Sequence, residues 1–232
     1  MITILSYNIQ LGKKMPKIIT WLGELVKKPD ILCFQEFPEK YIGDCLDALS
    51  DFPYAYRFAA SKRKKNQAFG ELTLFRTDRV QFISSKILTL GSNKLEKSVL
   101  RNDMPRNCLI TVFQQKKYRF ILTNVHLICL ALNAQRYSQV KTVIATLDKK
   151  NMPSVILGDF NISSVFGKKR LVSLMKEHLY TTNETYMTTH RLAFLHQQLD
   201  YVFGKKCKIL TVKVDRTRLS DHFPLLIEAS MN

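Results

Sequence analysis

Two kinds of hydrophobic pattern alternate along this chain, and together they predict a mixed α/β fold. Short, fully apolar runs, such as residues 31–34 and 155–157, are typical of strands that are buried on both faces. Residues 15–27 and 133–149 instead carry apolar side chains at helical intervals. The chain is therefore expected to alternate buried strands with helices that cover them.

Strands outnumber helices in the full pattern. We expect strands over residues 2–7, 31–34, 72–76, 80–90, 107–113, 119–125, 155–157, 199–203, 208–214 and 225–229. Helices are expected over residues 15–27, 39–49, 133–149 and 168–179, and surface loops over the basic segment 61–66 and the polar segment 91–106. Several strands follow one another directly, which favours two mixed β-sheets packed face to face with helices outside. No linker rich in Pro, Gly or Ser interrupts the pattern, so we expect residues 1–232 to form a single domain.

The balance of charge separates this chain from an ordinary globular protein. Lys and Arg number 36 and Asp and Glu 19, which gives a net charge of +17 at pH 7 and an isoelectric point near 9.7. Such an excess favours polyanionic partners, namely nucleic acid, an anionic membrane or a phosphorylated substrate. The alternative is a basic surface that serves only solubility.

Basic side chains gather at three places along the sequence: residues 62–65, 168–170 and 205–206. The second cluster follows closely on a predicted strand end, so we expect it to flank the functional site and to bind substrate through Lys168, Lys169 and Arg170. The alternative for each cluster is a solvated loop. Three phenylalanines are candidates for stacking against bases near these charges, or else core residues: Phe69, Phe160 and Phe166.

Cysteine usage and the first residues of the chain indicate a reducing compartment. The five cysteines include no pair at CxxC spacing, which argues against a disulfide framework and against a zinc site. The first predicted strand follows the initial Met without a basic and apolar leader, and no apolar run has the length of a transmembrane helix. We therefore expect a cytoplasmic protein without stable membrane insertion.

Acidic residues occur repeatedly where predicted strands begin or end. Glu36 and Asp159 each follow an apolar run, Asp200 precedes one, and Asp221 lies in a polar segment before the last strand. A buried carboxylate is costly unless a cation or a hydrogen-bond donor meets it. Four such residues favour a shared metal site over four separate strand caps. Carboxylate and amide oxygens without paired Cys or His suit Mg²⁺, with Mn²⁺ as a substitute.

Six short motifs fall at the ends of the predicted strands: Tyr7-Asn8, Gln35-Glu36, Thr123-Asn124-Val125-His126, Gly158-Asp159-Phe160-Asn161, Leu199-Asp200-Tyr201 and Ser220-Asp221-His222. This ordered set, which spans nearly the whole chain, resembles the endonuclease/exonuclease/phosphatase superfamily. The resemblance implies a DNase I-like fold, a four-layer α/β sandwich in which helices flank two mixed β-sheets. It also implies an active site at one rim of the two sheets.

The resemblance implies a metal-binding role for three side chains. Glu36 would be the principal metal carboxylate. Asn8 would lie beside it and orient metal-bound water or the phosphate. Asp221 would lie near the metal, directly or through water. The expected cofactor is Mg²⁺.

Five further residues form the catalytic group that the resemblance implies. Asp159 would position and activate the attacking water, and Asn161 would hold a non-bridging phosphate oxygen. His222 would contact the phosphate or transfer a proton, and Asp200 would fix its tautomer and charge. His126 would meet the phosphate or the leaving oxygen from the other side.

Other side chains are open to more than one interpretation. Arg106, at the start of a predicted strand, would reach the phosphate or would be a strand-edge charge. Glu71 would pair with His126, as in the DNase-like branch, or would be a turn residue beside glycine. The remaining histidines are interpreted as surface or structural residues: His178, His190 and His196.

Two departures move the chain away from AP endonucleases, because Gln10 stands where they place an acid and His126 where they usually have Tyr. The favoured branch contains DNases, tyrosyl-DNA phosphodiesterases, and lipid and inositol enzymes. We expect a monomeric, Mg²⁺-dependent phosphodiesterase that acts on nucleic acid, above all DNA. The alternatives are a phosphoinositide or sphingomyelin-type phosphohydrolase and a non-catalytic nucleic-acid-binding module on the same fold.

Overall fold

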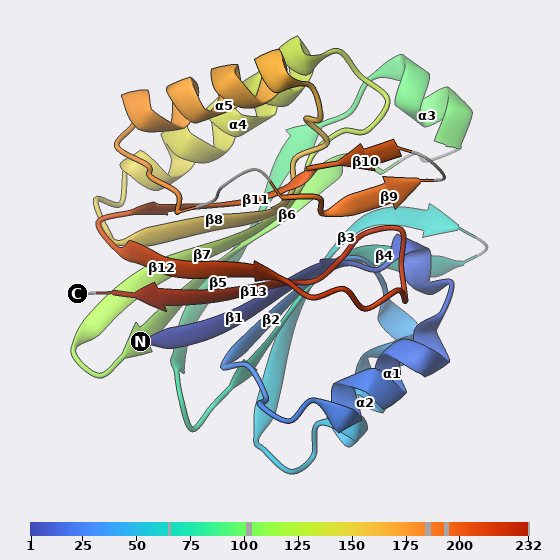
Figure 1. Ribbon diagram of the computed structural model, residues 1–232, viewed down its shortest axis with the longest axis vertical. Helices are drawn as coiled ribbons and strands as arrows, with labels where there is room; N and C mark the ends of the chain where they lie inside the picture. The colour runs from blue at the N-terminus through green and yellow to red at the C-terminus, as the bar shows by residue number, and fades with distance from the viewer. Residues whose placement is uncertain (65, 101–103, 184–186, 193–194, 232) are drawn as a thin grey trace.

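Two mixed β-sheets stacked face to face form the centre of the molecule (Figure 1). The computed structural model describes residues 1–64, 66–100, 104–183, 187–192 and 195–231. The first sheet contains β1 (Ile2–Asn8), β2 (Ile31–Pro38), β3 (Tyr54–Lys64), β4 (Gln67–Arg76), β12 (Lys208–Val214) and β13 (Leu225–Ser230). Their order is β12-β13-β1-β2-β4-β3, in which β1 and β2 are parallel and the other neighbours antiparallel.

The second sheet repeats this arrangement around another parallel pair. It contains β5 (Gln81–Gly91), β6 (Arg106–Gln115), β7 (Tyr118–His126), β8 (Ser154–Asp159) and β11 (Asp200–Lys205). Their order is β11-β8-β7-β6-β5, and only β7 and β8 run parallel. A separate antiparallel pair is formed by β9 (His190–Leu192) and β10 (Leu195–Gln197).

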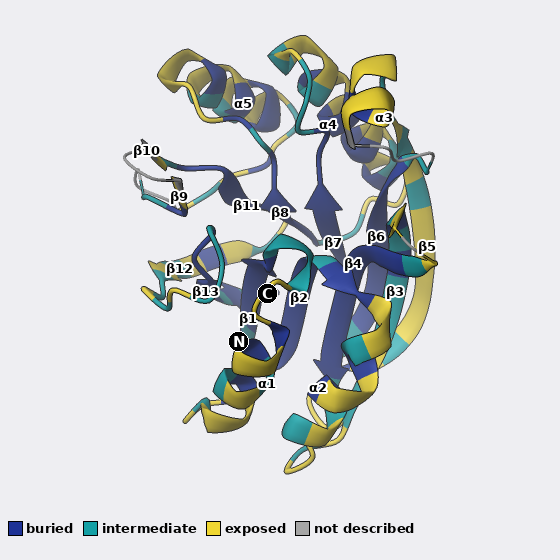
Figure 2. Ribbon diagram, turned by 90° about the vertical axis from the view of Figure 1, so that its right-hand side faces the viewer, coloured by how far each residue is buried: buried dark blue, intermediate teal, exposed yellow. Residues whose placement is uncertain are grey.

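Helices cover the outer face of each sheet and complete four layers (Figures 1 and 2). The first sheet carries α1 (Met15–Glu24) and α2 (Ile42–Ala48), and the second carries α4 (Asn133–Asp148) and α5 (Val165–Glu177). A short helix, α3 (Lys94–Leu100), and the 3₁₀ turns Gln10–Gly12 and Glu39–Tyr41 complete the set. The predicted four-layer sandwich is confirmed. Within the described ranges, every helix falls short of the length and apolar character that a bilayer crossing needs.

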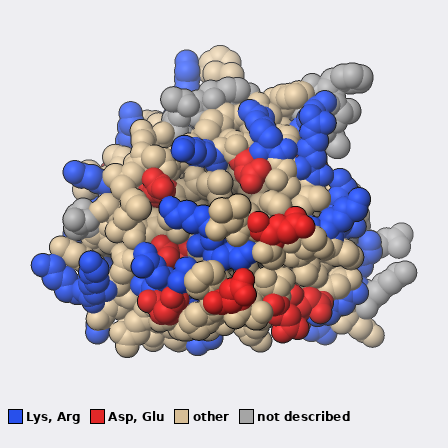
Figure 3. Space-filling view, turned by 60° about the horizontal axis from the view of Figure 1, so that its bottom comes forward, with Lys and Arg blue, Asp and Glu red and all other residues tan. Residues whose placement is uncertain are grey.

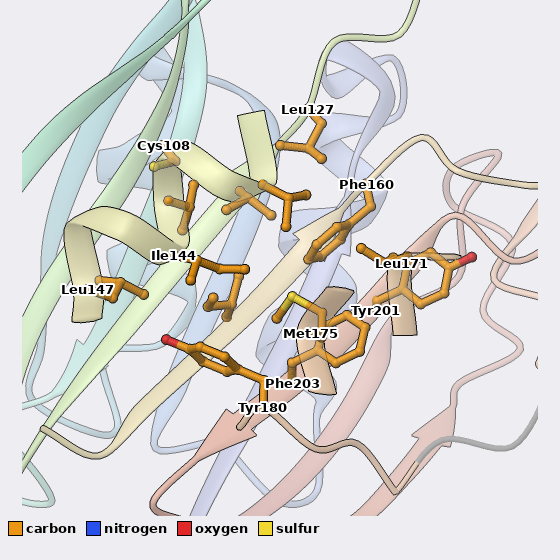
Figure 4. Packing of buried hydrophobic residues seen from close by; sticks show 14 of the residues in the cluster. Cys108, Leu127, Ile144, Leu147, Phe160, Leu171, Met175, Tyr180, Tyr201 and Phe203 are labelled. Carbon is orange, nitrogen blue, oxygen red and sulfur yellow. The ribbon is translucent and has the colours of Figure 1, made fainter. Parts of the chain in front are cut away.

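Apolar side chains fill each interface between layers. Strands of both sheets share the central cluster, to which Ile4, Phe75 and Leu157 belong. Figure 4 shows the outer cluster under α4 and α5, where Ile144 and Met175 pack onto the second sheet. A third cluster lies between the first sheet and the helices α1 and α2. Each buried apolar surface contributes about 25 cal/mol per Å², so both helical layers are held by the sheets they cover.

Phe160 belongs to the core and not to a substrate surface. Its ring lies edge-on to Tyr201 and Phe203, at centroid distances of 5.5 and 5.7 Å (Figure 4). Phe69 is also buried, whereas Phe166 is 84 % exposed. Of the three candidates for base stacking, Phe166 is therefore the one that solvent reaches.

The start of α5 lies three residues before the predicted one. Ser164 caps the helix, because its Oγ accepts a hydrogen bond of 3.0 Å from the backbone N of Gly167. The buried stripe that the pattern detected comprises Leu171, Leu174 and Met175. The prediction missed the first turn because the exposed residues of that turn do not extend the buried stripe.

Two segments predicted as loops contain helix or strand among their described residues. Segment 91–106 contains α3, because the side chain of Asn93 accepts a 2.6 Å hydrogen bond from the backbone N of Glu96 and so caps the helix. Within segment 61–66, β3 continues to Lys64 and β4 begins at Gln67, so the basic residues extend a hairpin. Lys65 of this cluster lies outside the described residues.

A buried amide network joins the two sheets directly below the rim that carries the predicted site. Gln35 Nε2 donates to Asn124 Oδ1 at 2.7 Å, and Asn124 Nδ2 donates to the carbonyl oxygens of Phe34 and Leu72 at 3.0 and 3.1 Å. Both amides are fully buried. Because an unsatisfied buried amide is costly, this network favours one alignment of the sheets.

Candidate active site

The carboxyl ends of two parallel strand pairs, one from each sheet, meet at this rim. Asn8 ends β1 and pairs with Gln35 of β2, while His126 ends β7 and pairs with Asp159 at the end of β8. Asp200 begins β11 and pairs with Asp159 from the other side. The fold therefore brings polar residues that are distant in sequence to one edge of both sheets.

Unusual backbone geometry aims several of these side chains. Glu36 lies at a β-bulge of β2 with φ 57°, and Asn161 has φ 54° directly after β8. Gly158 has φ 129°, and a Cβ there would lie 2.1 Å from the carbonyl oxygen of Val125. Glycine at this position allows β7 and β8 to approach, which sets the position of Asp159.

Asp159 is the centre of the cluster. Its Oδ2 accepts a 3.0 Å hydrogen bond from Asn8 Nδ2, and its Oδ1 accepts one of 2.8 Å from the backbone N of Asn161. The Nε2 atoms of His126 and His222 lie 3.6 and 3.7 Å from the same Oδ2. One carboxylate is thus held by two amides and flanked by two imidazoles.

His222 is held in its charged form. Its Nδ1 lies 2.8 Å from Asp200 Oδ2. Burial alone would lower the pKa of His222, but the carboxylates of Asp200, Asp159 and Asp221 together raise it to about 10. At neutral pH this imidazolium donates from Nδ1 to Asp200 and presents a second N–H, at Nε2, to the rim.

His126 is held in its neutral form. Arg106 Nη1 lies 3.2 Å from His126 Nδ1, and because a guanidinium has no acceptor, Nδ1 must be the acceptor. The proton of the neutral ring is therefore on Nε2, which faces Asp159 and lies 3.9 Å from Glu36 Oε1. Burial lowers the pKa of His126 well below its ordinary value, and the charges of Arg106 and His222 act in the same direction.

Arg106 is itself fixed by α3. Its Nη2 lies 2.6 Å from Glu96 Oε1, and both side chains are buried. Of the two interpretations of Glu71, the pairing with His126 does not form, because the Glu71 carboxyl group is hydrogen-bonded to Ser61 Oγ and Arg106 occupies Nδ1 of the imidazole. Burial raises the pKa of Glu71 to about 8, so this acid is protonated at neutral pH.

The two carboxyl groups that face the rim are destabilised as anions. Burial raises the pKa of Asp159 to about 7, although His222 opposes the shift. Burial also raises the pKa of Glu36, against the charges of Arg106 and His222. Asp221 adds a further oxygen donor, and a hard divalent cation beside such carboxylates would offset the cost of their charge. Among the described residues, however, the His, Cys, Asp and Glu side chains whose ligand atoms lie within 4.8 Å of one another are His190, Asp221 and His222. The oxygen chemistry of Glu36, Asp159 and Asp221 suits a hard cation such as the one expected from the sequence.

The roles of the smaller rim residues differ in detail from expectation. Asn8 gives its Nδ2 to Asp159 and accepts a 3.0 Å hydrogen bond from the backbone N of Gln10 at its Oδ1, so its amide orients the central carboxylate. Asp221 accepts a 2.7 Å hydrogen bond from Gln10 Nε2. Asn161 gives its side-chain N–H to the carbonyl of Leu127 at 3.0 Å.

His190 lies beside the candidate site, although nothing in the sequence indicated it. Its ring lies 4.7 Å from that of His222 between centroids, and its Nε2 lies 3.9 Å from Asp221 Oδ2. His190 was interpreted from the sequence as a surface or structural residue, and it is buried. No local pattern could reveal it, because an isolated bridge between His190 and His222 joins positions far apart in sequence.

The three basic clusters reach different places. Lys62 lines a cavity of about 180 Å³ together with Glu36, Arg106 and His126. In the third cluster Lys205 pairs with Asp148 of α4 at 2.6 Å. On the face seen in Figure 3, Lys and Arg are spread out with acidic side chains between them and are not gathered into one patch.

The second basic cluster lies on α5, beyond the carboxylates. Lys168 Nζ donates to Gln198 Oε1 at 2.5 Å, and the Arg170 guanidinium lies 4.9 Å from the centre of the Tyr137 ring. Lys169 is exposed. These contacts do not include Asp159, and the role of the three residues in substrate binding stays a prediction.

Comparison with known proteins gives one family match. A model of the endonuclease/exonuclease/phosphatase family matches residues 5–222. A UPF0294 protein of Photorhabdus laumondii, plu0699, is 27 % identical over 128 residues, which are 53 % of this chain and 48 % of that protein. The chain thus spans about half the length of the curated relatives it matches.

Solved structures show the same fold at low sequence identity. An endonuclease/exonuclease/phosphatase from Bacteroides vulgatus superimposes with a TM-score of 0.77 at 14 % identity, over 100 % of this chain and 99 % of the other. A mannosyl-6-phosphatase from Bacteroides thetaiotaomicron superimposes with a TM-score of 0.69 at 19 % identity, over 99 % of each chain. The architecture is therefore shared across proteins whose sequences have diverged widely.

Proposed function

Because the chain belongs to the endonuclease/exonuclease/phosphatase family, we propose that it is a metal-assisted phosphodiesterase that hydrolyses nucleic acid, above all DNA. Enzymes of this family are generally phosphoester hydrolases and typically use divalent metal ions. The observation that carries the proposal is the position of Asp159 between a neutral and a charged imidazole. We further propose that residues 1–232 act as one catalytic domain.

Asp159 is proposed to position the attacking water and to accept its proton. Asn8 and the backbone of Asn161 hold the two carboxylate oxygens, which leaves the remaining lone pairs directed at the rim. A carboxylate whose pKa lies near 7 is a stronger base than an ordinary aspartate. In this proposal Asn161 also contributes its side chain to the phosphate-binding surface.

The two histidines are proposed to donate to the phosphate from opposite sides. His222, charged and fixed by Asp200, would stabilise the negative charge that develops on the phosphate oxygens. His126, neutral and fixed by Arg106, would donate a hydrogen bond from its Nε2 N–H to a phosphate or leaving oxygen and would keep its proton. Both donors are oriented before substrate arrives, so no reorganisation is needed during reaction.

Glu36, Asp221 and the amide of Asn8 are the residues proposed to hold a divalent cation, with Mg²⁺ favoured and Mn²⁺ as a substitute. When bound, the ion would polarise the phosphate and neutralise charge on its oxygens. The net charge of +17 favours an extended polyanion as substrate. The contacts among Asn8, His126, Asp159, Asp200 and His222 favour this proposal over the alternative of a non-catalytic binding module.

A phospholipid or phosphoinositide substrate is the second candidate, and one observation favours it. Leu132, just before α4, and Val165 and Phe166, in the first turn of α5, are 78, 65 and 84 % exposed. Exposed apolar side chains next to a basic active site are typical of proteins that act at a membrane surface. This feature was not recognisable from the sequence pattern.

A substrate panel with Mg²⁺ tests the proposal. It should include plasmid, single-stranded DNA, RNA, an abasic duplex, a 5′-tyrosyl oligonucleotide, sphingomyelin and an inositol phosphate. We expect hydrolysis of nucleic acid, reduced by about 10²–10⁴-fold in Asp159→Asn. Hydrolysis of only the lipid or inositol substrate would support the second candidate function instead. Full activity of Asp159→Asn would refute the role of Asp159 as the general base.

A further inference from the structure

A groove runs along α5 next to the rim, and we propose that it is a subsite for unpaired nucleotides that flank the scissile phosphate. It encloses about 510 Å³ and is lined by one face of α5, together with Ser163 and Tyr201. This assignment rests on the proposed function, whose substrate it narrows to nucleic acid with a single-stranded segment.

Apolar and cationic residues alternate along the helix face that lines the groove. Val165, Lys168, Lys169, Val172 and Lys176 recur at spacings of one, three and four, which places them side by side on α5. Single-stranded nucleic acid alternates in the same way between flat apolar bases and charged phosphates. The lining is therefore complementary to such a strand in both charge and polarity.

An exposed aromatic ring stands at the end of α5 nearest the rim. Phe166 is 84 % exposed, although Phe160, six residues earlier, is fully packed. It lies within one helical turn of Lys169 and Arg170. Stacking of a base on an aromatic ring is worth about 1–3 kcal/mol, and neighbouring cations can hold the adjoining phosphates.

The groove begins close to the catalytic carboxylate. Ser163 lies two residues after Asn161, whose backbone N is bound to Asp159. Tyr201 is anchored by its hydroxyl, which donates to the carbonyl of Ile162 at 2.6 Å. This floor is therefore formed before substrate binds, and a strand that leaves the site over Asn161 would enter the groove directly.

The interleaved lining favours a nucleic-acid strand over a membrane. A bilayer anchor needs apolar side chains that insert together, with the charges around their edge. Here Lys168 and Lys169 lie between Val165 and Val172 on the groove-lining face, so the apolar residues cannot insert without the lysines. Paired bases hide their faces inside the duplex, which restricts the groove to unpaired nucleotides.

Binding measurements on the full-length Asp159→Asn protein test the subsite without cleavage. The probes are a fluorescein-labelled oligothymidylate, a labelled hairpin duplex and phosphatidylserine/phosphatidylcholine vesicles. We expect Phe166→Ala to raise the Kd for oligothymidylate about tenfold and to change the Kd for the duplex less than twofold. Lys169→Ala should reduce the slope of log K against log salt by about 0.7 for the single strand.

Matched controls lie on the opposite outer layer, just after α1. Val26 and Lys27 are exposed there, far from α5 in the four-layer order, so Val26→Ala and Lys27→Ala should leave the oligothymidylate Kd within twofold. Wild-type oligothymidylate binding by both Phe166→Ala and Lys169→Ala would overturn the subsite. Loss of vesicle binding with unchanged oligonucleotide binding would also overturn it and assign the surface to lipid.

The substrate panel separates this inference from the proposed function. If Phe166→Ala weakens single-strand binding but no phosphodiester is hydrolysed, the subsite stands and the proposed reaction fails. If nucleic acid is hydrolysed but Phe166→Ala and Lys169→Ala leave the Kd for oligothymidylate unchanged, the proposed reaction stands and the subsite fails.

Discussion

His126 and His222 flank the same carboxylate at almost equal distances, yet they carry different charges. Around His126, burial dominates the pKa shifts. It keeps the imidazole neutral and keeps nearby Glu71 protonated up to about pH 8. Around His222 three carboxylates outweigh burial and keep the ring charged. The difference teaches that the group at Nδ1 fixes what each imidazole can donate. Arg106 leaves the single proton of neutral His126 on Nε2, whereas Asp200 helps to keep both nitrogens of His222 protonated.

The largest effect on activity is expected when His222 loses its acidic partner. Asp200→Asn removes the charge at Nδ1 and should lower activity by about 10³–10⁴-fold, as for other histidines that lose a supporting carboxylate. The measurement is turnover of the best panel substrate, with circular dichroism to confirm folding. A folded variant with less than tenfold loss would show that Asp200 does not set the state of His222.

Removal of Arg106 tests the arrangement that holds His126. Arg106→Ala leaves Glu96 buried without its partner, which should lower the free energy of unfolding by about 3–5 kcal/mol. The matched control is Arg76→Ala, because Arg76 pairs with the more exposed Asp78 and should contribute about 1 kcal/mol or less. Denaturant titration compares them, and equal losses would contradict a special role for Arg106.

The burial of Glu71 predicts a pH-dependent stability. Its pKa rises from an ordinary 4.5 to about 8. Between these values the unfolded chain has released a proton that the folded chain retains, so the free energy of unfolding falls as pH rises. Glu71→Gln cannot titrate and should be more stable than the parent by roughly 3 kcal/mol at pH 7, but not at pH 4. Parallel stability–pH curves would show that Glu71 is not held protonated.

The smallest effect is expected at His190, which touches His222 without bonding to Asp159. His190→Ala should lower turnover about tenfold, equivalent to about 1.4 kcal/mol, because it exposes the imidazolium and Asp221 to water. His178→Ala is the control, since His178 pairs with Asp148 at the surface. Equal activities of the two variants would remove His190 from the site.

The sequence predicted those parts of the candidate site that lie at or near a strand end. Asn8, Glu36 and Asp159 follow buried apolar runs, and the parallel pairing of those runs brings their ends to one rim. The four-layer order was predictable for the same reason, because each layer leaves its own period in the chain.

Features that depend on contacts between distant segments could not be predicted. The protonation state of His126 depends on Arg106 and, through Arg106, on Glu96. Glu96 lies in α3, within the polar segment 91–106 that was predicted to be a loop. His190 enters the site through one bridge to His222. Such contacts leave no periodic pattern, so spacing alone cannot reveal them.

The most direct test of the two-histidine comparison is ¹⁵N NMR of the imidazole nitrogens in the metal-free, full-length protein at pH 7. Signals are assigned with His126→Gln and His222→Gln. We predict two protonated nitrogens in His222 and a single proton, on Nε2, in His126. A neutral His222, or a His126 protonated at Nδ1, would contradict the division of charge between the two sides of Asp159.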